Sequence, residues 1–224
     1  MHVILFDIDG TLIHTRGAGR AALRRALAED FGIDEPNDSV PVEGRTDRGI
    51  TRDLFAAHQI DETPENWQKF RDSYLKHLPD QLRNRPGTVL PGILSLLSTL
   101  QSTGHVAMGL LTGNTRRGAG IKLSHFGIDH YFEFGGFGDL HYQRNDVAAE
   151  ALGEVRSRHG ADFDAGRVWV IGDTALDIQC ARSIGAKAIA VGTGGHTLDE
   201  LRTAQPDHLF SDLEDSSALV KLWN

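Results

Sequence analysis

The chain has 224 residues and a formal net charge of −8, and its acidic balance excludes a general nucleic-acid binder, which would need clustered Lys and Arg. The single cysteine, Cys180, excludes an internal disulfide and is typical of a reducing compartment. No apolar run reaches the roughly 18 residues that span a bilayer, and Asp7 interrupts the N-terminal apolar stretch, so we expect neither a membrane segment nor a signal peptide. We therefore expect a cytoplasmic monomer or homodimer with no nucleic-acid or membrane partner.

The first predicted element is a buried strand at residues 3–6, "VILF", because a run of branched and aromatic residues is typical of a strand covered on both faces. Asp7 and Asp9 follow this strand at once. Side chains alternate along an extended chain, so the two carboxylates can face the same side. Gly10, the next residue, allows the backbone to turn closely around a bound group.

The segment from residue 14 to residue 85 has a different pattern, with helix-like periodicity and no convincing strand. The predicted helices cover 17–31, 46–59 and 64–83. A helical block inserted between the first strand and the rest of the chain is typical of a cap over a site, and the Pro and Gly of "NRPGTVLPG" mark its far boundary. We predict an α/β catalytic core of residues 1–14 and 84–224 and a helical cap of residues 15–83.

From residue 86 onward, apolar strand-like runs alternate with amphipathic segments. The predicted strands are 105–112, 131–136, 167–173, 187–192 and 207–211, and the predicted helices are 92–102, 115–126, 145–159, 175–184 and 197–203. This alternation predicts βαβ units and a mainly parallel sheet with helices on both faces. Ligands of such sheets bind beyond the carboxyl ends of the strands, so we expect the functional residues there.

Polar residues follow two further predicted strands. "LLTGN" places Thr112 before two loop amides that open a helix, which is a suitable cradle for an anion. "VIGDTALD" places Asp173 at a strand end and Asp177 in the first turn of the next helix. Carboxylates that converge repel one another by roughly 4 kcal/mol per pair at about 4 Å and an effective dielectric near 20. The cluster therefore requires a cation, a proton, or both, and a site of oxygen ligands that leaves room for a phosphate favours Mg²⁺.

Three of these segments, "FDIDGTL", "LLTGN" and "VIGDTALDIQCARSIGAKAIAVGTG", resemble the first, second and fourth motifs of the haloacid dehalogenase superfamily. "GRTDRGI" (44–50) and "KLSHFGIDHYF" (122–132) are similar to segments of its phosphoglycolate phosphatase-like members. The resemblance covers nearly the whole chain and implies a Rossmann-like α/β core with a small helical cap. It also implies a Mg²⁺-dependent phosphatase acting on a small phosphorylated metabolite, with phosphoglycolate as the closest analogy.

The resemblance implies a role for each acidic residue. Asp7 would be the nucleophile that forms an aspartyl-phosphate, and Asp9 would protonate the leaving alcohol and then activate water. The Asp7 carboxylate, the Asp9 backbone carbonyl and Asp173 would hold the metal. Asp177 would hold a water of the metal or the basic residue of the site.

Further residues are expected to contact the substrate. The resemblance implies that Gly10, Thr112, Gly113 and Asn114 hold phosphoryl oxygens. In the cap, we expect Arg45 and Thr46 to contact the leaving group, because a turn-like glycine precedes them and a helix follows.

The third motif of the superfamily departs from its usual form in this chain. The family usually has a lysine just before the helix that leads to the Gly-Asp strand, and "FGDLHYQRNDVAAEAL" offers Arg144 at that place. Lys122 and Lys187 do not fit it, because one is predicted within a helix and the other opens a strand. Arginine stays charged and can bind phosphate through two parallel hydrogen bonds, so Arg144 is the expected substitute.

Three alternatives to a phosphatase remain open. A phosphosugar mutase of the same superfamily would retain both Asp7 and Asp9. A dehalogenase would need neither the second aspartate nor a metal, so Asp9 and Asp173 argue against it. A non-catalytic phosphate-binding or signalling relative would keep the same group of residues without turnover.

Overall fold

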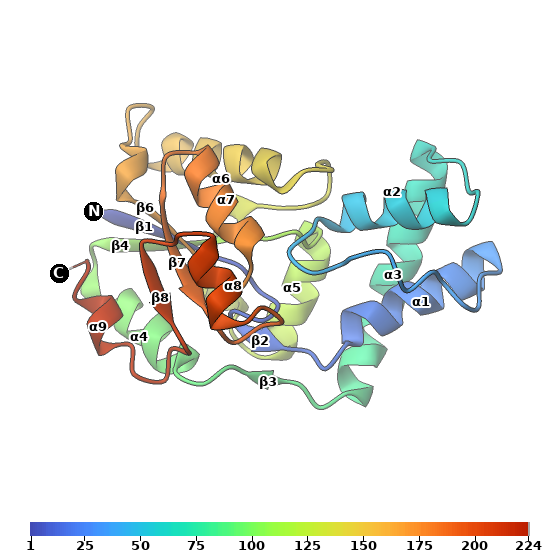
Figure 1. Cartoon of the computed structure of the whole chain (residues 1–224), viewed down its shortest axis with the longest axis horizontal. Helices are drawn as coiled ribbons and strands as arrows, with labels where there is room; N and C mark the ends of the chain where they lie inside the picture. Colours follow the sequence, from blue (N-terminus) through green and yellow to red (C-terminus); the bar gives the residue numbers. More distant parts are fainter. Residues whose placement is uncertain (224) are drawn as a thin grey trace.

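The computed structural model describes residues 1–223 and contains a six-stranded sheet in the order β5-β4-β1-β6-β7-β8 (Figure 1). Every neighbouring pair in this sheet is parallel. The strands are β1 His2–Phe6, β4 Val106–Leu111, β5 Gly135–Gly136, β6 Val168–Gly172, β7 Lys187–Val191 and β8 His208–Phe210. The carboxyl ends of β4, β1 and β6 therefore meet at one edge of the sheet. The expected α/β fold with a mainly parallel sheet is confirmed.

Helices cover both faces of the sheet, which explains why β1 reads as a continuous apolar run. Ile4 and Phe6 pack into the core on the side of α4 (Ile93–Thr103) and α5 (Arg116–His125), and Val3 and Leu5 pack on the side of α6 (Arg144–His159) and α7 (Ala175–Ser183). All four residues are fully buried. The helices around the sheet are α4 Ile93–Thr103, α5 Arg116–His125, α6 Arg144–His159, α7 Ala175–Ser183, α8 Leu198–Thr203 and α9 Ser217–Val220.

Three helices form a separate group on one side of the sheet (Figure 1). They are α1 Ala18–Phe31, α2 Asp47–Ala57 and α3 Pro64–Asn84. They share an apolar core of their own, which includes Leu27, Phe55, Phe70 and Leu78. Thr46 and Thr63 fix the starts of α2 and α3 by accepting backbone hydrogen bonds. The assignment of residues 15–83 as a cap domain stays a prediction, and we use "helical block" for α1–α3.

Some short elements differ from the sequence expectation. The predicted strand 131–136 is reduced to Gly135–Gly136, because Asp129–Tyr131 form a 3₁₀ turn. A two-stranded antiparallel pair, β2 Ile13–His14 with β3 Thr88–Val89, joins the two connections of the helical block, where no strand was expected. A second 3₁₀ turn covers Ala165–Arg167. Among the described residues, no helix combines the length and apolar character of a membrane span.

Candidate active site

The ends of β1, β4 and β6 open into a cavity of about 400 Å³ between the sheet and the helical block. Asp7 follows β1 directly, and its backbone N–H donates to the carbonyl of Ile171 in β6 at 2.9 Å. Residues from the core, including Asp7, Asp9, Gly113, Asn114 and Asp173, line this cavity together with residues of the helical block.

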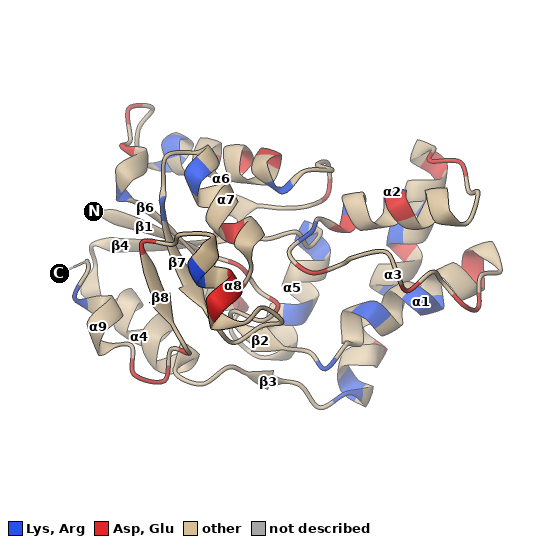
Figure 2. Cartoon of the chain, viewed as in Figure 1, with Lys and Arg blue, Asp and Glu red and all other residues tan. Residues whose placement is uncertain are grey.

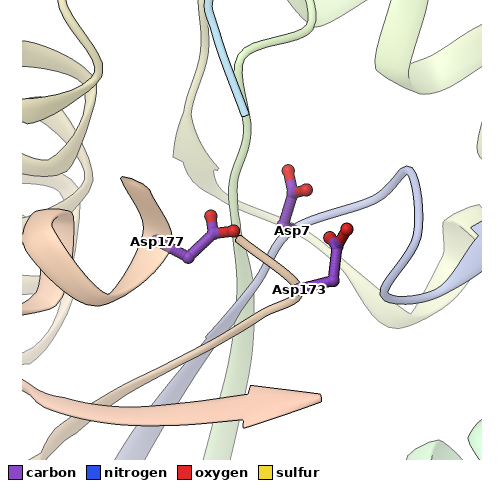
Figure 3. A group of neighbouring side chains, drawn as sticks. All are labelled: Asp7, Asp173 and Asp177. Carbon is purple, nitrogen blue, oxygen red and sulfur yellow. The ribbon is translucent and has the colours of Figure 1, made fainter. Parts of the chain in front are cut away.

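Asp7, Asp173 and Asp177 form a buried acidic cluster beside the cavity (Figure 3). Each offers a carboxylate oxygen within 4.8 Å of the others, and the three residues are at most 5% exposed. Burial, together with the neighbouring negative charges, raises the pKa of Asp7 to about 6 and that of Asp173 to about 8. The repulsion expected from the sequence is therefore present, and a bound cation would relieve it.

The donor set of this cluster fits a hard divalent cation, because it consists of carboxylate oxygens. The hydroxyl of Thr11 donates to Asp173 Oδ1 at 3.0 Å and fixes that side chain. Gly194 approaches the same carboxylate so closely that a Cβ there would lie 1.6 Å from Asp173 Oδ2. A Cβ on Gly10, whose φ is +83°, would lie 2.4 Å from the same oxygen. The absence of a side chain at these two positions therefore leaves room for the Asp173 carboxylate.

Asp177 has both of its carboxylate oxygens engaged. Oδ1 lies 2.5 Å from Arg144 Nη2, and Oδ2 accepts hydrogen bonds from the backbone N–H and the hydroxyl of Thr174 at 3.0 and 2.6 Å. The contacts to Thr174 close a capping box at the start of α7. Two roles are expected for Asp177, holding a water of the metal or holding the basic residue of the site, and the contact with Arg144 is the arrangement that the second role requires.

Arg144 begins α6 and reaches the acidic cluster from the α6 side of the sheet. Its Nη2 lies 2.9 Å from Asp7 Oδ1, and the residue is only 6% exposed. Burial raises the pKa of Asp7, whereas the Arg144 charge lowers it. Arg144 thus places a positive charge beside Asp7, and its role as the substitute for the third-motif lysine stays a prediction.

The loop after β4 forms a compact hydrogen-bonded group. The buried Thr112 hydroxyl accepts from the backbone N–H and the side-chain amide of Asn114 at 3.3 and 2.8 Å. The Asn114 amide also donates to Asp9 Oδ2 at 3.0 Å. The carbonyl of Gly113 accepts from the backbone N–H of Asp47 at 2.7 Å, so the first turn of α2 is docked on this loop.

The two residues expected in the cap have side chains that are already engaged. The Arg45 guanidinium contacts Asp53 at 2.6 Å and two backbone carbonyls. The Thr46 hydroxyl caps α2 and lies 3.2 Å from the carbonyl of Tyr142. Their contact with substrate stays a prediction. Arg16 and Arg20, which the sequence reasoning did not select, line the cavity.

Lys122 is a residue of this site that the sequence reasoning set aside. It lies within α5, as expected, yet its Nζ is 2.5 Å from Asp9 Oδ2 and 2.7 Å from Asn114 Oδ1. The physical reason is that helical side chains slope toward the helix N-terminus, and the N-terminus of α5 is at the site. Lys187, in contrast, lies on β7 with its ammonium over the Trp169 ring, where it lines no part of the cavity.

A Gly194→Ala substitution is expected to disable the acidic cluster. The new Cβ would overlap the Asp173 carboxylate, so the Asp173 side chain or the loop around residue 194 must shift. We expect turnover to fall by roughly 10²-fold or more, because misplacement by about 1 Å has that effect. Steady-state kinetics over a range of Mg²⁺ concentrations would measure it. Gly153→Ala, where a Cβ meets nothing within 4 Å, is the matched control. Unchanged kinetics of Gly194→Ala would contradict this reading of the loop.

Comparison with known proteins agrees with this geometry. The family model described as Haloacid dehalogenase-like hydrolase matches residues 4–191. The chain belongs to the haloacid dehalogenase-like hydrolase family.

The similar proteins include a phosphoglycolate phosphatase and a 5'-nucleotidase. The chain is 29% identical to a phosphoglycolate phosphatase of Synechococcus elongatus, over 96% of this chain and 95% of that protein. It is 30% identical to a 5'-nucleotidase of Pseudomonas aeruginosa, over 94% of this chain and 91% of that protein. The structure of CbbY from Rhodobacter sphaeroides, in complex with phosphate, has a TM-score of 0.76 at 19% identity, with 96% of each chain covered. The expected family and enzyme class, a phosphoric monoester hydrolase, are confirmed.

Proposed function

We propose that this haloacid dehalogenase-like hydrolase is a Mg²⁺-dependent phosphatase of a small phosphorylated metabolite. The reaction would pass through an aspartyl-phosphate on Asp7. The observation that carries this proposal is the buried cluster of Asp7, Asp173 and Asp177, with Arg144 placed 2.9 Å from Asp7 beside the cavity.

The residues around the cavity have complementary roles in such a reaction. Mg²⁺, when bound, would be held by Asp7, Asp173 and the Asp9 carbonyl and would neutralise charge on the phosphoryl oxygens. The ionised Asp7 carboxylate attacks phosphorus, and the bond from phosphorus to the alcohol oxygen breaks. Asp9 gives the departing alcohol its proton and later takes one from the water that hydrolyses the aspartyl-phosphate.

The remaining phosphoryl oxygens need donors that are already in place before the reaction. The backbone N–H of Gly113 is the first candidate, because it donates to no acceptor among the described residues and Gly113 lines the cavity. The N–H groups of Gly10 and Asn114 also lie at the cavity but donate to the Ile13 carbonyl at 2.9 Å and to the Thr112 hydroxyl at 3.3 Å, so they would have to exchange these acceptors for phosphate. Thr112 would act indirectly, because its hydroxyl accepts a hydrogen bond from the Asn114 side chain and fixes that residue. Phosphate monoesters are among the slowest biological bonds to hydrolyse unaided, so fixed donors and charges at one point are what the reaction requires.

The cavity favours a small leaving group that carries its own negative charge. Arg16 and Arg20 line it, and neither has a carboxylate within ion-pair distance among residues 1–223. Figure 2 shows basic positions on α5 and around the start of α1, where the helical block meets the sheet. Phosphoglycolate, which bears a carboxylate next to its phosphate ester, fits this description and is the substrate in the name of the Synechococcus relative.

The purified chain is expected to release phosphate from p-nitrophenyl phosphate and, with higher kcat/KM, from phosphorylated carboxylic acids. EDTA should abolish turnover, and added Mg²⁺ should restore it, because the cluster otherwise retains unbalanced charge. A panel of phosphorylated metabolites assayed with and without Mg²⁺ measures both effects.

The same panel separates the alternatives. Release of an isomeric sugar phosphate without free phosphate would indicate a mutase. Metal-independent activity would contradict the proposed metal. The absence of turnover on every monoester would favour a phosphate-binding relative.

A further inference from the structure

We propose that Lys122 is a positioning residue that fixes the Asp9 carboxyl group for proton transfer to the leaving alcohol. This inference rests on the proposed phosphatase function. It adds a second basic residue to the site, because Lys122 of α5 contacts Asp9 whereas Arg144 of α6 contacts Asp7.

Lys122 and Asn114 hold one oxygen of Asp9. Lys122 Nζ lies 2.5 Å and Asn114 Nδ2 lies 3.0 Å from Asp9 Oδ2. Among residues 1–223, Asp9 Oδ1 has no hydrogen-bond partner. One carboxyl oxygen is therefore fixed by two donors, and the other is left for the reacting group in the cavity.

The ammonium group of Lys122 is itself held rigidly. The side chain is 5% exposed, and Nζ makes a second hydrogen bond, to Asn114 Oδ1 at 2.7 Å. The Asn114 amide in turn donates to the Thr112 hydroxyl, which links Lys122 to the phosphate side of the site. A buried lysine is rare unless it is paired, and here both of its partners belong to the candidate active site.

The helical block covers Lys122 and closes the side of the cavity near it. A Cβ on Gly19 of α1 would lie 3.5 Å from Lys122 Nζ and 3.7 Å from the hydroxyl of Tyr74 of α3. Lys122 is thus enclosed by two helices of the block, while its charge points to Asp9. Removal of the lysine would leave Asp9 with a single side-chain donor, the amide of Asn114.

This role predicts a dependence on the leaving group that a merely structural role would not produce. An alkoxide needs a proton as it leaves, whereas p-nitrophenolate is stable without one, so only the first reaction depends on the position of Asp9. kcat/KM reports the steps through departure of the alcohol and is independent of the later hydrolysis of the aspartyl-phosphate. We therefore compare kcat/KM for the best alkyl phosphate of the metabolite panel with that for p-nitrophenyl phosphate.

Lys122→Met keeps an unbranched side chain that is one heavy atom shorter and removes its charge. We expect kcat/KM for the alkyl phosphate to fall by about 10²-fold or more, in line with the contribution of a positioned acid, and kcat/KM for p-nitrophenyl phosphate to fall by less than about tenfold. Arg117→Met, which removes an exposed charge from the same helix, is the matched control and should change neither value. Lys122→Gln replaces Lys122→Met if the latter does not fold, with the same difference expected between substrates.

The result that overturns the inference is an equal decrease for both substrates, or no decrease, in whichever Lys122 variant folds. Failure of the proposed function looks different, because then the wild-type chain hydrolyses no phosphate monoester at all. Activity of the wild type with an unchanged substrate ratio in the variant would reject only the role of Lys122.

Discussion

Asp7→Asn is expected to lose turnover by roughly 10⁴-fold or more, since removal of a nucleophile has effects of this size. The side chain lies at the end of β1, is 5% exposed and contacts Arg144 at 2.9 Å. Asparagine has nearly the same shape and can keep a hydrogen bond to Arg144. Its neutral amide, however, cannot attack phosphorus to form the acyl phosphate. The loss should therefore occur without loss of the fold.

Two measurements check this expectation. Steady-state assays at saturating Mg²⁺ give the loss of turnover, and a rapid acid quench with ³²P-labelled substrate traps the labelled protein in the wild type but not in Asp7→Asn. Asp162→Asn, an exposed aspartate, provides the control. Substantial turnover by Asp7→Asn, or label that remains on the variant, would exclude Asp7 as the nucleophile.

Arg144→Ala is expected to lower kcat/KM by roughly 10²–10³-fold, as removal of one stabilising donor does elsewhere. It should also reduce the free energy of unfolding by about 3 kcal/mol, because the buried Asp7 and Asp177 would lose their shared positive partner. Arg144→Lys keeps the charge and is expected to retain more activity than Arg144→Ala. Kinetics and chemical denaturation of both variants separate the catalytic effect from the structural one.

The pH dependence of kcat/KM provides a second test of Arg144→Ala. Burial raises the pKa of Asp7 to about 6 and Arg144 opposes that shift, so loss of Arg144 raises the pKa further. Asp7 attacks only when ionised, so the acidic limb of kcat/KM should move to higher pH in Arg144→Ala. It should stay nearer its wild-type position in Arg144→Lys. Near-normal activity of Arg144→Ala with an unmoved limb would rule out this role.

The sheet and the acidic part of the site could be predicted from the sequence because their signals are local. The apolar run of β1 ends at Asp7, and that of β6 ends at Asp173, so the end of each strand marks a position on the edge of the sheet. The parallel order then brings the two residues together, within the 4.8 Å of the observed cluster. Arg144 could be selected only through the resemblance to the third motif of the family, because it stands just before the predicted helix 145–159, where that motif usually has a lysine.

The parts that could not be predicted depend on contacts between segments far apart in the chain. Lys122 reads as an interior residue of a helix, and only the direction of α5 relative to β1 brings its ammonium to Asp9. The sequence suggests that Arg45 is an unpaired cation after a turn, but its guanidinium forms an ion pair with Asp53, which lies about two helical turns further along the chain. β2 and β3 have two residues each and pair with one another, so both are too short to show a strand pattern in the sequence.

That short pair of β2 and β3 has a consequence for how such enzymes diversify. Both passages of the chain between sheet and helices run through it, with Ile13 opposite Val89 and His14 opposite Thr88. A segment inserted between these two connections begins and ends at the β2–β3 pair. Its length and sequence can therefore change while Asp7 keeps its position at the end of β1. Exchange of the inserted segment alone can then change the substrate preference, while the reacting residues at the edge of the sheet stay the same.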